Sequence, residues 1–207
     1  MSAYRGAVYG VQANIETNDP ALCSPSGGSP SFSTAWAMVT PDQPYHWAQS
    51  GYVDVGAVNS TFTHGFHYMS QYTQSCRPTC SGVTTVITGS PGTTVHTYSS
   101  ALRPSDNRIH MTVGSTNLDT VNYDVRNYWA SAWGGQFGGE TMHTESDVPG
   151  TSSDHTTFGH IYKVASDGSL DFFSNLAFAE TGSTRYHHNL GNADSGGLFV
   201  DIWTNPL

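Results

Sequence analysis

The chain has 207 residues, of which 11% are Asp, Glu, Lys or Arg, against roughly 25% in an ordinary soluble domain. Neutral polar residues must therefore cover the surface: the chain holds 25 Ser, 24 Thr and 22 Gly, but one lysine, Lys163. The net charge of −9, without any basic run, argues against nucleic acid or an anionic membrane as partner, because both need clustered Lys and Arg. No stretch reaches the roughly 20 apolar residues of a membrane span.

Alternation of apolar and polar residues with period two, broken by clusters of Gly, Pro, Asn and Ser, dominates the chain. It predicts strands over residues 6–15, 32–39, 46–55, 62–73, 83–88, 93–98, 108–113, 118–125, 128–133, 140–145, 156–164, 170–177 and 198–203. No helical stretch lies between them, which disfavours a parallel α/β sheet. The predicted fold class is all-β, a jelly-roll-like sandwich of two antiparallel sheets, with residues 1–207 forming one domain.

The three cysteines are informative about the cellular compartment of the protein. Cys76 and Cys80 bracket a short loop that contains a proline, which is typical of a small disulfide; half of a metal site is the alternative. Cys23 is left over. A disulfide, abundant Ser and Thr, and scarce lysine together predict a secreted, extracellular protein. No signal peptide is visible at the first residues, so we expect that a targeting segment has been removed.

Two common kinds of catalytic site are disfavoured. Asp194-Ser195-Gly196-Gly197 resembles the nucleophile turn of trypsin-like proteases, but only ten residues follow it, too few for a specificity pocket. The closest histidine sets are His64 with His67, His155 with His160, and His187 with His188. None has the helical spacing around a carboxylate that favours zinc, and adjacent strand residues face opposite ways. We expect ordinary polar histidines, with no metal and no cofactor.

A glutamine and a glutamate stand in segments that suit the hydrolysis of a polypeptide. Gln49 is followed by Gly51, which we expect to leave room for a ligand backbone. Glu140, one of only four Glu, follows four glycines that we expect to allow close approach of an extended substrate. A carboxylate can take a proton from water and return it to the leaving amine, while an amide can stabilise the oxyanion. The alternative is that both are ordinary strand-surface residues.

Aromatic residues are abundant, with five Trp and eleven Tyr. Aromatic faces in a sandwich can stack on sugar rings, but the core between two sheets also needs such side chains. The candidate substrate-binding residues are Trp36, Trp47, Tyr68 and Trp133, which lie in or near the two segments.

At these segments the sequence resembles the glutamic peptidases, both the fungal eqolisins and the neprosin-like proteins. Gln49-Ser50-Gly51 is similar to the eqolisin segment with the catalytic glutamine, and Gly138-Gly139-Glu140 to the segment of the second catalytic glutamate. Residues 66–69 and the following Cys76 and Cys80 are similar to a strand and a close Cys pair of neprosin-like proteins. The features follow the same order over residues 5–203.

The resemblance implies a sandwich with a substrate groove on its concave face, in a cofactor-free endopeptidase that cleaves polypeptides at acid pH. Glu140 would be the general base and acid, and Gln49 the oxyanion donor and water-positioning residue. Ser70 and Gln71 depart from the family, since related sequences often carry a carboxylate there. Gly-Gly also occurs twice, and a second alignment places Gln136 at the catalytic position, without a carboxylate. The alternative function is a non-catalytic extracellular sandwich that binds glycan or peptide, or that forms a structural assembly.

Overall fold

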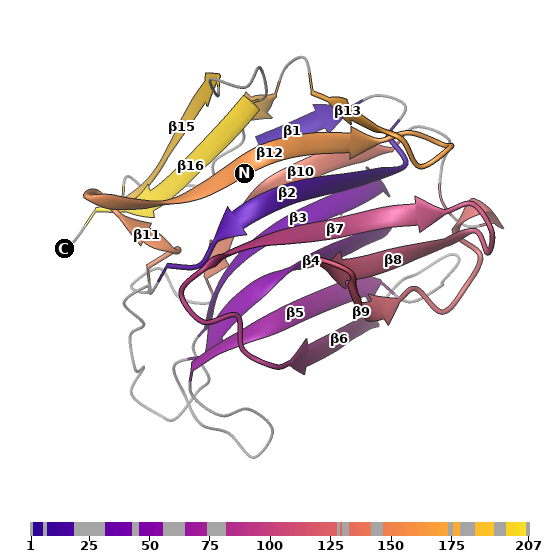
Figure 1. The fold of residues 1–207 in the computed structure, drawn as a ribbon, viewed down its shortest axis with the longest axis horizontal. Helices are drawn as coiled ribbons and strands as arrows, with labels where there is room; N and C mark the ends of the chain where they lie inside the picture. Colours follow the sequence, from indigo (N-terminus) through magenta and orange to yellow (C-terminus); the bar gives the residue numbers. More distant parts are fainter. Residues whose placement is uncertain are drawn as a thin grey trace.

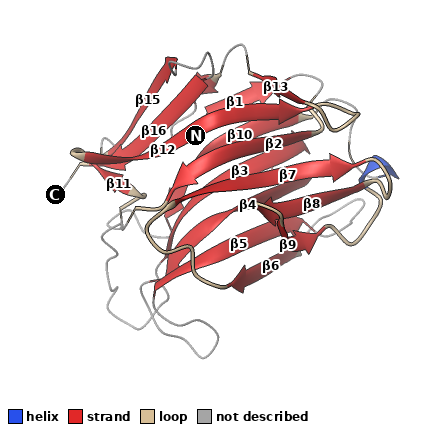
Figure 2. Cartoon of the chain, viewed as in Figure 1, coloured by secondary structure: helices blue, strands red, loops and turns tan. Residues whose placement is uncertain are grey.

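The computed structural model describes residues 2–5, 8–18, 32–42, 46–55, 65–73, 82–127, 129, 133–141, 147–173, 176–178, 185–192 and 198–205. Most of them lie in strands that form two packed sheets, and the described part has one short 3-10 turn, η1 (Val125–Asn127) (Figures 1 and 2). The prediction of an all-β sandwich is confirmed. Within these ranges, no helix is long and apolar enough to cross a membrane.

The seven-stranded sheet has the order β14-β1-β10-β3-β4-β5-β6, and all its pairings are antiparallel. Its strands are β1 (Ser2–Arg5), β3 (Phe32–Asp42), β4 (His46–Val55), β5 (Gly65–Thr73), β6 (Val83–Thr88), β10 (Gly134–Thr141) and β14 (Ala177–Phe178). Strands β3 to β6 follow one another along the chain, whereas β10 comes from much later and pairs with β3. This arrangement places the segments of Gln49 and Glu140 in one sheet.

The nine-stranded sheet has the order β15-β16-β11-β12-β2-β7-β8-β9, with β13 paired to β12. Its strands are β2 (Gly10–Glu16), β7 (Val95–Arg103), β8 (Arg108–Val113), β9 (Thr116–Thr120), β11 (Gly150–Thr151), β12 (Asp154–Val164), β13 (Leu170–Phe172), β15 (Tyr186–Asn192) and β16 (Leu198–Thr204). Every recorded pairing is antiparallel except that of β11 with β16.

Alternation along each strand divides the apolar side chains between two locations. Two clusters fill the space between the sheets; their members include Val11, Ile15, Tyr52, Tyr98, Phe137, Phe158, Val39, Ile109, Met111 and Trp133. A third cluster occupies the opposite side of the seven-stranded sheet and consists of Trp36, Met38, Val53, Val55 and Met69, with Phe32, Trp47 and Ile87 packed against it. We call this side, which also carries Gln49, Gln71, Gln136 and Glu140, the outer face.

The largest difference between prediction and structure is in β10. Strands were expected over 128–133 and 140–145, but the glycine-rich stretch between them forms the strand, and Trp133 precedes it. A Cβ on Gly135 would lie 2.5 Å from Val11 Cγ1, and one on Gly139 would lie 2.7 Å from Ile202 Cδ1. These two glycines therefore allow the sheets to pack, and the expectation that they admit a substrate is corrected.

Other boundaries also differ. The strand expected over 118–125 ends at Thr120 and is followed by η1, and the strand expected over 170–177 is divided into β13 and β14. The sequence patterns did not predict β15, whose residues Tyr186–Asn192 carry few apolar side chains.

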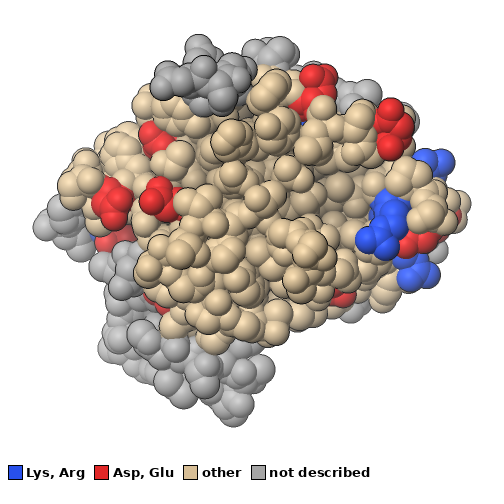
Figure 3. Space-filling model, viewed as in Figure 1, with Lys and Arg blue, Asp and Glu red and all other residues tan. Residues whose placement is uncertain are grey.

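Charged side chains are sparse on the surface. In the view of Figure 3, Lys and Arg gather at the end where β7 meets β8, and Asp and Glu are scattered. The described surface between them carries few charges, as the composition requires.

Candidate functional site

The three residues of Gln49-Ser50-Gly51 occupy different environments because they alternate along β4. Gln49 is only 4% exposed and lies on the outer face, while Ser50 points between the sheets and accepts a hydrogen bond of 3.0 Å from Ser100 Oγ. A Cβ on Gly51 would meet the backbone of β3, 2.7 Å from Trp36 Cα. The space beside Gly51 is therefore filled by the neighbouring strand, and the expectation that it is left for a ligand is corrected.

The amide of Gln49 is held by a neighbouring amide. Its Nε2 donates to Gln71 Oε1 over 2.8 Å, and Gln71 Nε2 donates in turn to Thr85 Oγ1 over 3.0 Å. The three residues lie directly opposite one another on β4, β5 and β6. Gln71 thus accepts from one neighbour and donates to the other, which links the three side chains across β4, β5 and β6.

The strand register decides which β10 residue faces Gln49. Gln49 is opposite Met38, and Met38 is opposite Gln136, so these three side chains form one row across the outer face. Glu140 lies four residues further along β10, opposite Thr34. At about 3.4 Å per residue and 4.8 Å per strand, the Cα atoms of Gln49 and Glu140 are about 17 Å apart. The register therefore does not bring the two predicted catalytic side chains together.

Glu140 nevertheless shares the outer face with Gln49. Among the described side chains of β3, β4, β5, β6 and β10, it is the only carboxylate on that face. The residue is exposed, yet the protein around its carboxyl removes enough water to raise the pKa of Glu140 above its ordinary value. Such a group retains its proton at a higher pH than a fully hydrated glutamate.

Trp36 and Trp47, two of the four predicted substrate-binding aromatics, lie on the outer face. Trp36 belongs to the third cluster and Trp47 packs against it. The indole Nε1 of Trp36 is buried and donates no hydrogen bond within the described part of the chain. A buried donor without an acceptor costs about 1–3 kcal/mol, so a carbonyl oxygen beside it would be stabilising.

Tyr68 and Trp133, the other two predicted aromatics, point between the sheets. Tyr68 lies opposite the fully buried Tyr52, and its ring centroid is 5.4 Å from that of His96. Trp133 is 5% exposed and packs against Trp129, with ring centroids 5.0 Å apart. Both side chains therefore lie away from the outer face, between the sheets, where large aromatics commonly stabilise the core of a sandwich, and their assignment as substrate-binding residues stays a prediction.

A cavity of about 430 Å³ lies between the sheets, away from Gln49. Its lining residues are Tyr68, Thr88, Gly89, Val95, His96, Thr97, Val113, Gly114, Thr116 and Leu118. The lining comes from β5 to β9 and the turns between them, and it includes neither Gln49 nor Glu140. This cavity is therefore separate from the outer face.

The described histidines serve as packing and hydrogen-bonding groups. His155 and His187 stack on Trp203, with ring centroids 4.0 Å and 5.5 Å from it. His188 is adjacent to His187 in β15 and projects from the other side of that strand. Within the described ranges no three His, Cys, Asp or Glu residues come together as a metal-binding group. His64 lies outside these ranges.

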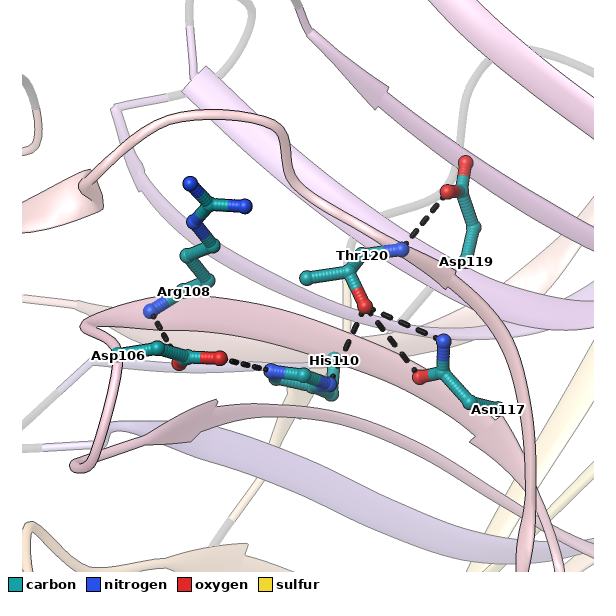
Figure 4. A network of polar contacts seen from close by, with 6 residues as sticks. All are labelled: Asp106, Arg108, His110, Asn117, Asp119 and Thr120. Atoms are coloured by element: carbon teal, nitrogen blue, oxygen red, sulfur yellow. Dashed lines mark hydrogen bonds and ion pairs between the residues drawn. The ribbon is translucent and has the colours of Figure 1, made fainter.

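A short relay of polar contacts joins β8 and β9 (Figure 4). Asp106 Oδ2 lies 2.8 Å from His110 Nε2, and His110 Nδ1 lies 3.2 Å from Thr120 Oγ1. The order carboxylate, imidazole, hydroxyl is that of a hydrolase triad. However, the Thr120 hydroxyl also contacts Asn117, and the Thr120 amide donates to Asp119 Oδ1, so the network is closed on itself. We therefore interpret this network as stabilising the β8–β9 hairpin, and not as a catalytic site.

Several predicted features lie outside the described residues. They are Cys23, the Cys76–Cys80 disulfide and the turn Asp194-Ser195-Gly196-Gly197. The disulfide and the secreted location inferred partly from it remain predictions.

Sequence reasoning gave no role to Gln71 and placed Gln136 at the catalytic position only in a second alignment. The sequence feature that could have identified Gln136 is the first Gly-Gly pair of β10, Gly134-Gly135. When this pair is aligned with the Gly-Gly of the family's catalytic segment, Gln136 takes the catalytic position, and the strand register places the same residue in the row of Gln49.

Two solved structures are similar to this chain over almost its whole length. A crystal structure of Scytalido-glutamic peptidase with a peptide based transition state analog has a TM-score of 0.55 and 14% identity, covering 98% of this chain and 96% of that chain. A crystal structure of the same peptidase with a transition state analog inhibitor has a TM-score of 0.56, 16% identity and the same coverage. No family model and no curated protein matches the chain. The fold is therefore glutamic peptidase-like, and the similarity to neprosin-like proteins remains a prediction.

Proposed function

We propose that this protein binds an extended polypeptide on the outer face of its seven-stranded sheet, as a secreted protein without a cofactor. The observation that carries the proposal is the row of amides from Gln136 through Gln49 to Gln71, on a fold similar to peptidases crystallised with transition state analogs. A primary amide has two donors and one acceptor, which complement the C=O and N–H of a peptide backbone. Trp36 and Trp47 add aromatic surface for the side chains of the ligand.

The second candidate function is hydrolysis of the bound polypeptide by a glutamic-type mechanism at acid pH. Glu140 would act as general base and acid, and Gln49 would stabilise the oxyanion. The raised pKa of Glu140 favours it, because an acid–base catalyst works best when its pKa is near the working pH. The register counts against it, because about 17 Å between the Cα atoms is too far for both groups to act on one peptide bond.

One experiment separates the two. The wild type and Glu140→Gln are mixed with a fluorescently labelled, unstructured polypeptide between about pH 3 and 7, and binding is followed by anisotropy and cleavage by mass spectrometry. Glu16→Gln is the matched control, since burial also raises the pKa of Glu16 but this residue lies on the nine-stranded sheet. Binding without cleavage supports the first proposal. Cleavage that Glu140→Gln alone abolishes supports the second.

Failure to bind any unstructured polypeptide would reject both functions. A glycan that binds the wild type in place of the polypeptide, or self-association into an assembly, would then become the function to pursue.

A further inference from the structure

We infer that Gln136 is the β10 residue that meets the ligand together with Gln49, and that these two amides hydrogen-bond the same peptide group of the bound polypeptide. This inference rests on the proposed function, because it takes the ligand to be a polypeptide. It adds the residue pair, the chemical group recognised and the reason why this row does not hydrolyse that group.

The geometry of the row supports the pairing. Gln136 and Gln49 lie on the two strands that flank β3, both opposite Met38. Two strand spacings put their Cα atoms about 10 Å apart. Met38 between them carries no hydrogen-bonding group apart from a weakly accepting sulfur, and at 2% exposed it is covered by other atoms of the protein, which a ligand would have to displace. A group bound above Met38 would have an amide on each side.

The orientation of Gln49 supports a peptide group as that ligand. One Nε2 hydrogen of Gln49 is committed to Gln71 Oε1, and the Gln71 amide is itself directed toward Thr85. Gln49 is left with one N–H and the oxygen Oε1, which match the C=O and N–H of a peptide unit. A charged ligand would require a countercharge here, and the described side chains of this row carry none.

The same row lacks the group that hydrolysis needs. Neither Gln136 nor Gln49 can accept a proton from water at ordinary pH, whereas a carboxylate can. Gln136→Glu changes an amide to a carboxylate of nearly the same shape and would complete a carboxylate–amide pair. The carboxylate would take a proton from water as the water oxygen bonds to the peptide carbon. That proton would then pass to the amide nitrogen as the C–N bond breaks, and water is the only co-reactant.

Three folded variants test the inference against the wild type in the same binding and cleavage assays, with thermal melts to establish folding. Gln136→Leu removes the amide but keeps the size, Gln136→Glu supplies the carboxylate, and Glu16→Gln on the nine-stranded sheet is the control. We expect Gln136→Leu to weaken polypeptide binding about tenfold, because it removes hydrogen bonds worth about 1.4 kcal/mol in total. Glu16→Gln should bind within about twofold of the wild type.

We expect Gln136→Glu to produce cleavage fragments that are absent with the wild type and with the double variant Gln136→Glu/Gln49→Leu. The inference is overturned if Gln136→Leu binds as the wild type does, or if Gln136→Glu folds and binds but cleaves nothing. In either case, binding by the wild type would leave the proposed function standing. Absence of binding by the wild type would instead reject the proposed function itself.

Discussion

Gln49 Nε2 donates a hydrogen bond of 2.8 Å to Gln71 Oε1, so the Gln49 amide is held by a residue of the neighbouring strand. Gln71→Leu removes the acceptor and leaves a donor of Gln49, a residue only 4% exposed, without its partner. A buried group that loses its hydrogen bond costs about 1–3 kcal/mol. We expect the free energy of unfolding to fall by that amount and polypeptide binding to weaken, as measured by urea denaturation and fluorescence anisotropy.

Gln71→Glu is the control for this prediction. A carboxylate still accepts from Gln49 but no longer donates to Thr85, which is on the partly exposed edge strand β6. Binding should therefore be largely preserved in Gln71→Glu. Equal losses in the two variants would show that the hydrogen bond to Thr85, which both lack, matters more than the acceptor for Gln49.

Ser50 and Ser100 link the two sheets directly behind Gln49. Ser100 Oγ is 3.0 Å from Ser50 Oγ and 3.2 Å from the carbonyl oxygen of Ala37, and both serines are fully buried. Ser100→Ala leaves the Ser50 hydroxyl without this partner, so we expect a loss of about 1–3 kcal/mol in urea denaturation. Ser50→Ala should cost less, since Ser100 retains Ala37 as acceptor. A larger loss of stability in Ser50→Ala than in Ser100→Ala would contradict this assignment of the hydrogen bonds.

Gly51 is required by the close approach of β3 to β4. An added Cβ would meet the Ala35 carbonyl oxygen and lie 2.7 Å from Trp36 Cα, both of which are backbone atoms that cannot rotate away. Overpacking of this kind commonly costs 1–3 kcal/mol, and here the backbone must move, so we expect Gly51→Ala to lose more than about 3 kcal/mol.

The comparison for Gly51→Ala is Gly159→Ala in β12, where a Cβ would meet no atom within 4 Å. Its unfolding free energy should stay within about 0.5 kcal/mol of the wild type. Similar urea midpoints for the two variants would contradict the steric argument. They would mean that the space beside Gly51 is not filled by β3 and could take a ligand.

The sequence predicted strands that are rich in aromatic and β-branched residues, and it failed where glycines leave no pattern of polar and apolar residues to read. Strand β4 was predicted over its exact observed range, because Trp47, Tyr52, Val53 and Val55 are residue types that favour strands. In β10, four of the eight residues are glycines, which show no alternation, so this central strand was read as a loop with strands on either side.

The candidate site depended on register, which is a non-local property. Gln49, Trp36 and Trp47 lie on one face of neighbouring strands, because β3 and β4 are consecutive in the chain. Whether Gln136 or Glu140 faces Gln49 is decided by the pairing of β10 with β3, about 100 residues apart in the chain. A shift of four residues preserves the face but moves the carboxylate about 13 Å along the strand.

Asp106 makes the stability of the β8–β9 hairpin dependent on pH (Figure 4). Its slight burial tends to raise the pKa of Asp106, but hydrogen bonds from His110 and the Arg108 amide outweigh this and lower it. A carboxyl with a lowered pKa stabilises the fold above its unfolded pKa of about 3.9 and loses that contribution as the pH falls through the folded value.

Asp106→Asn should therefore lower the free energy of unfolding at pH 5–7 by no more than about 1 kcal/mol, since the group is exposed, and the difference should shrink as the pH falls below the unfolded pKa. Thr120→Val is the control, because it removes a contact of His110 but no carboxylate, so its effect should change less with pH. An Asp106→Asn difference that stays constant from pH 7 to 3, in urea titrations at each pH, would refute the linkage.

We expect the fold to tolerate acid, because the chain has only seven Lys and Arg residues with which its carboxylates can form ion pairs. In the described part of the chain, the carboxylates with an ion pair include Asp106, Asp147, Asp171 and Asp201. Against these, the pKa of Glu16 is raised, first by burial and then by the nearby Asp154 charge. A carboxyl with a raised pKa destabilises the fold while it is ionised, so its protonation offsets part of what the others lose in acid.

We therefore expect near-ultraviolet circular dichroism to show a folded protein down to about pH 3–4; a midpoint of unfolding above about pH 5 would contradict this. Glu16→Gln isolates the opposing contribution. The variant should be more stable than the wild type at pH 7, where Glu16 is ionised, and should lose that advantage as the pH falls toward 4 and the wild-type carboxyl takes up its proton. A variant less stable than the wild type at pH 7 would mean that the Glu16 carboxylate is held by favourable contacts instead of being destabilised by burial.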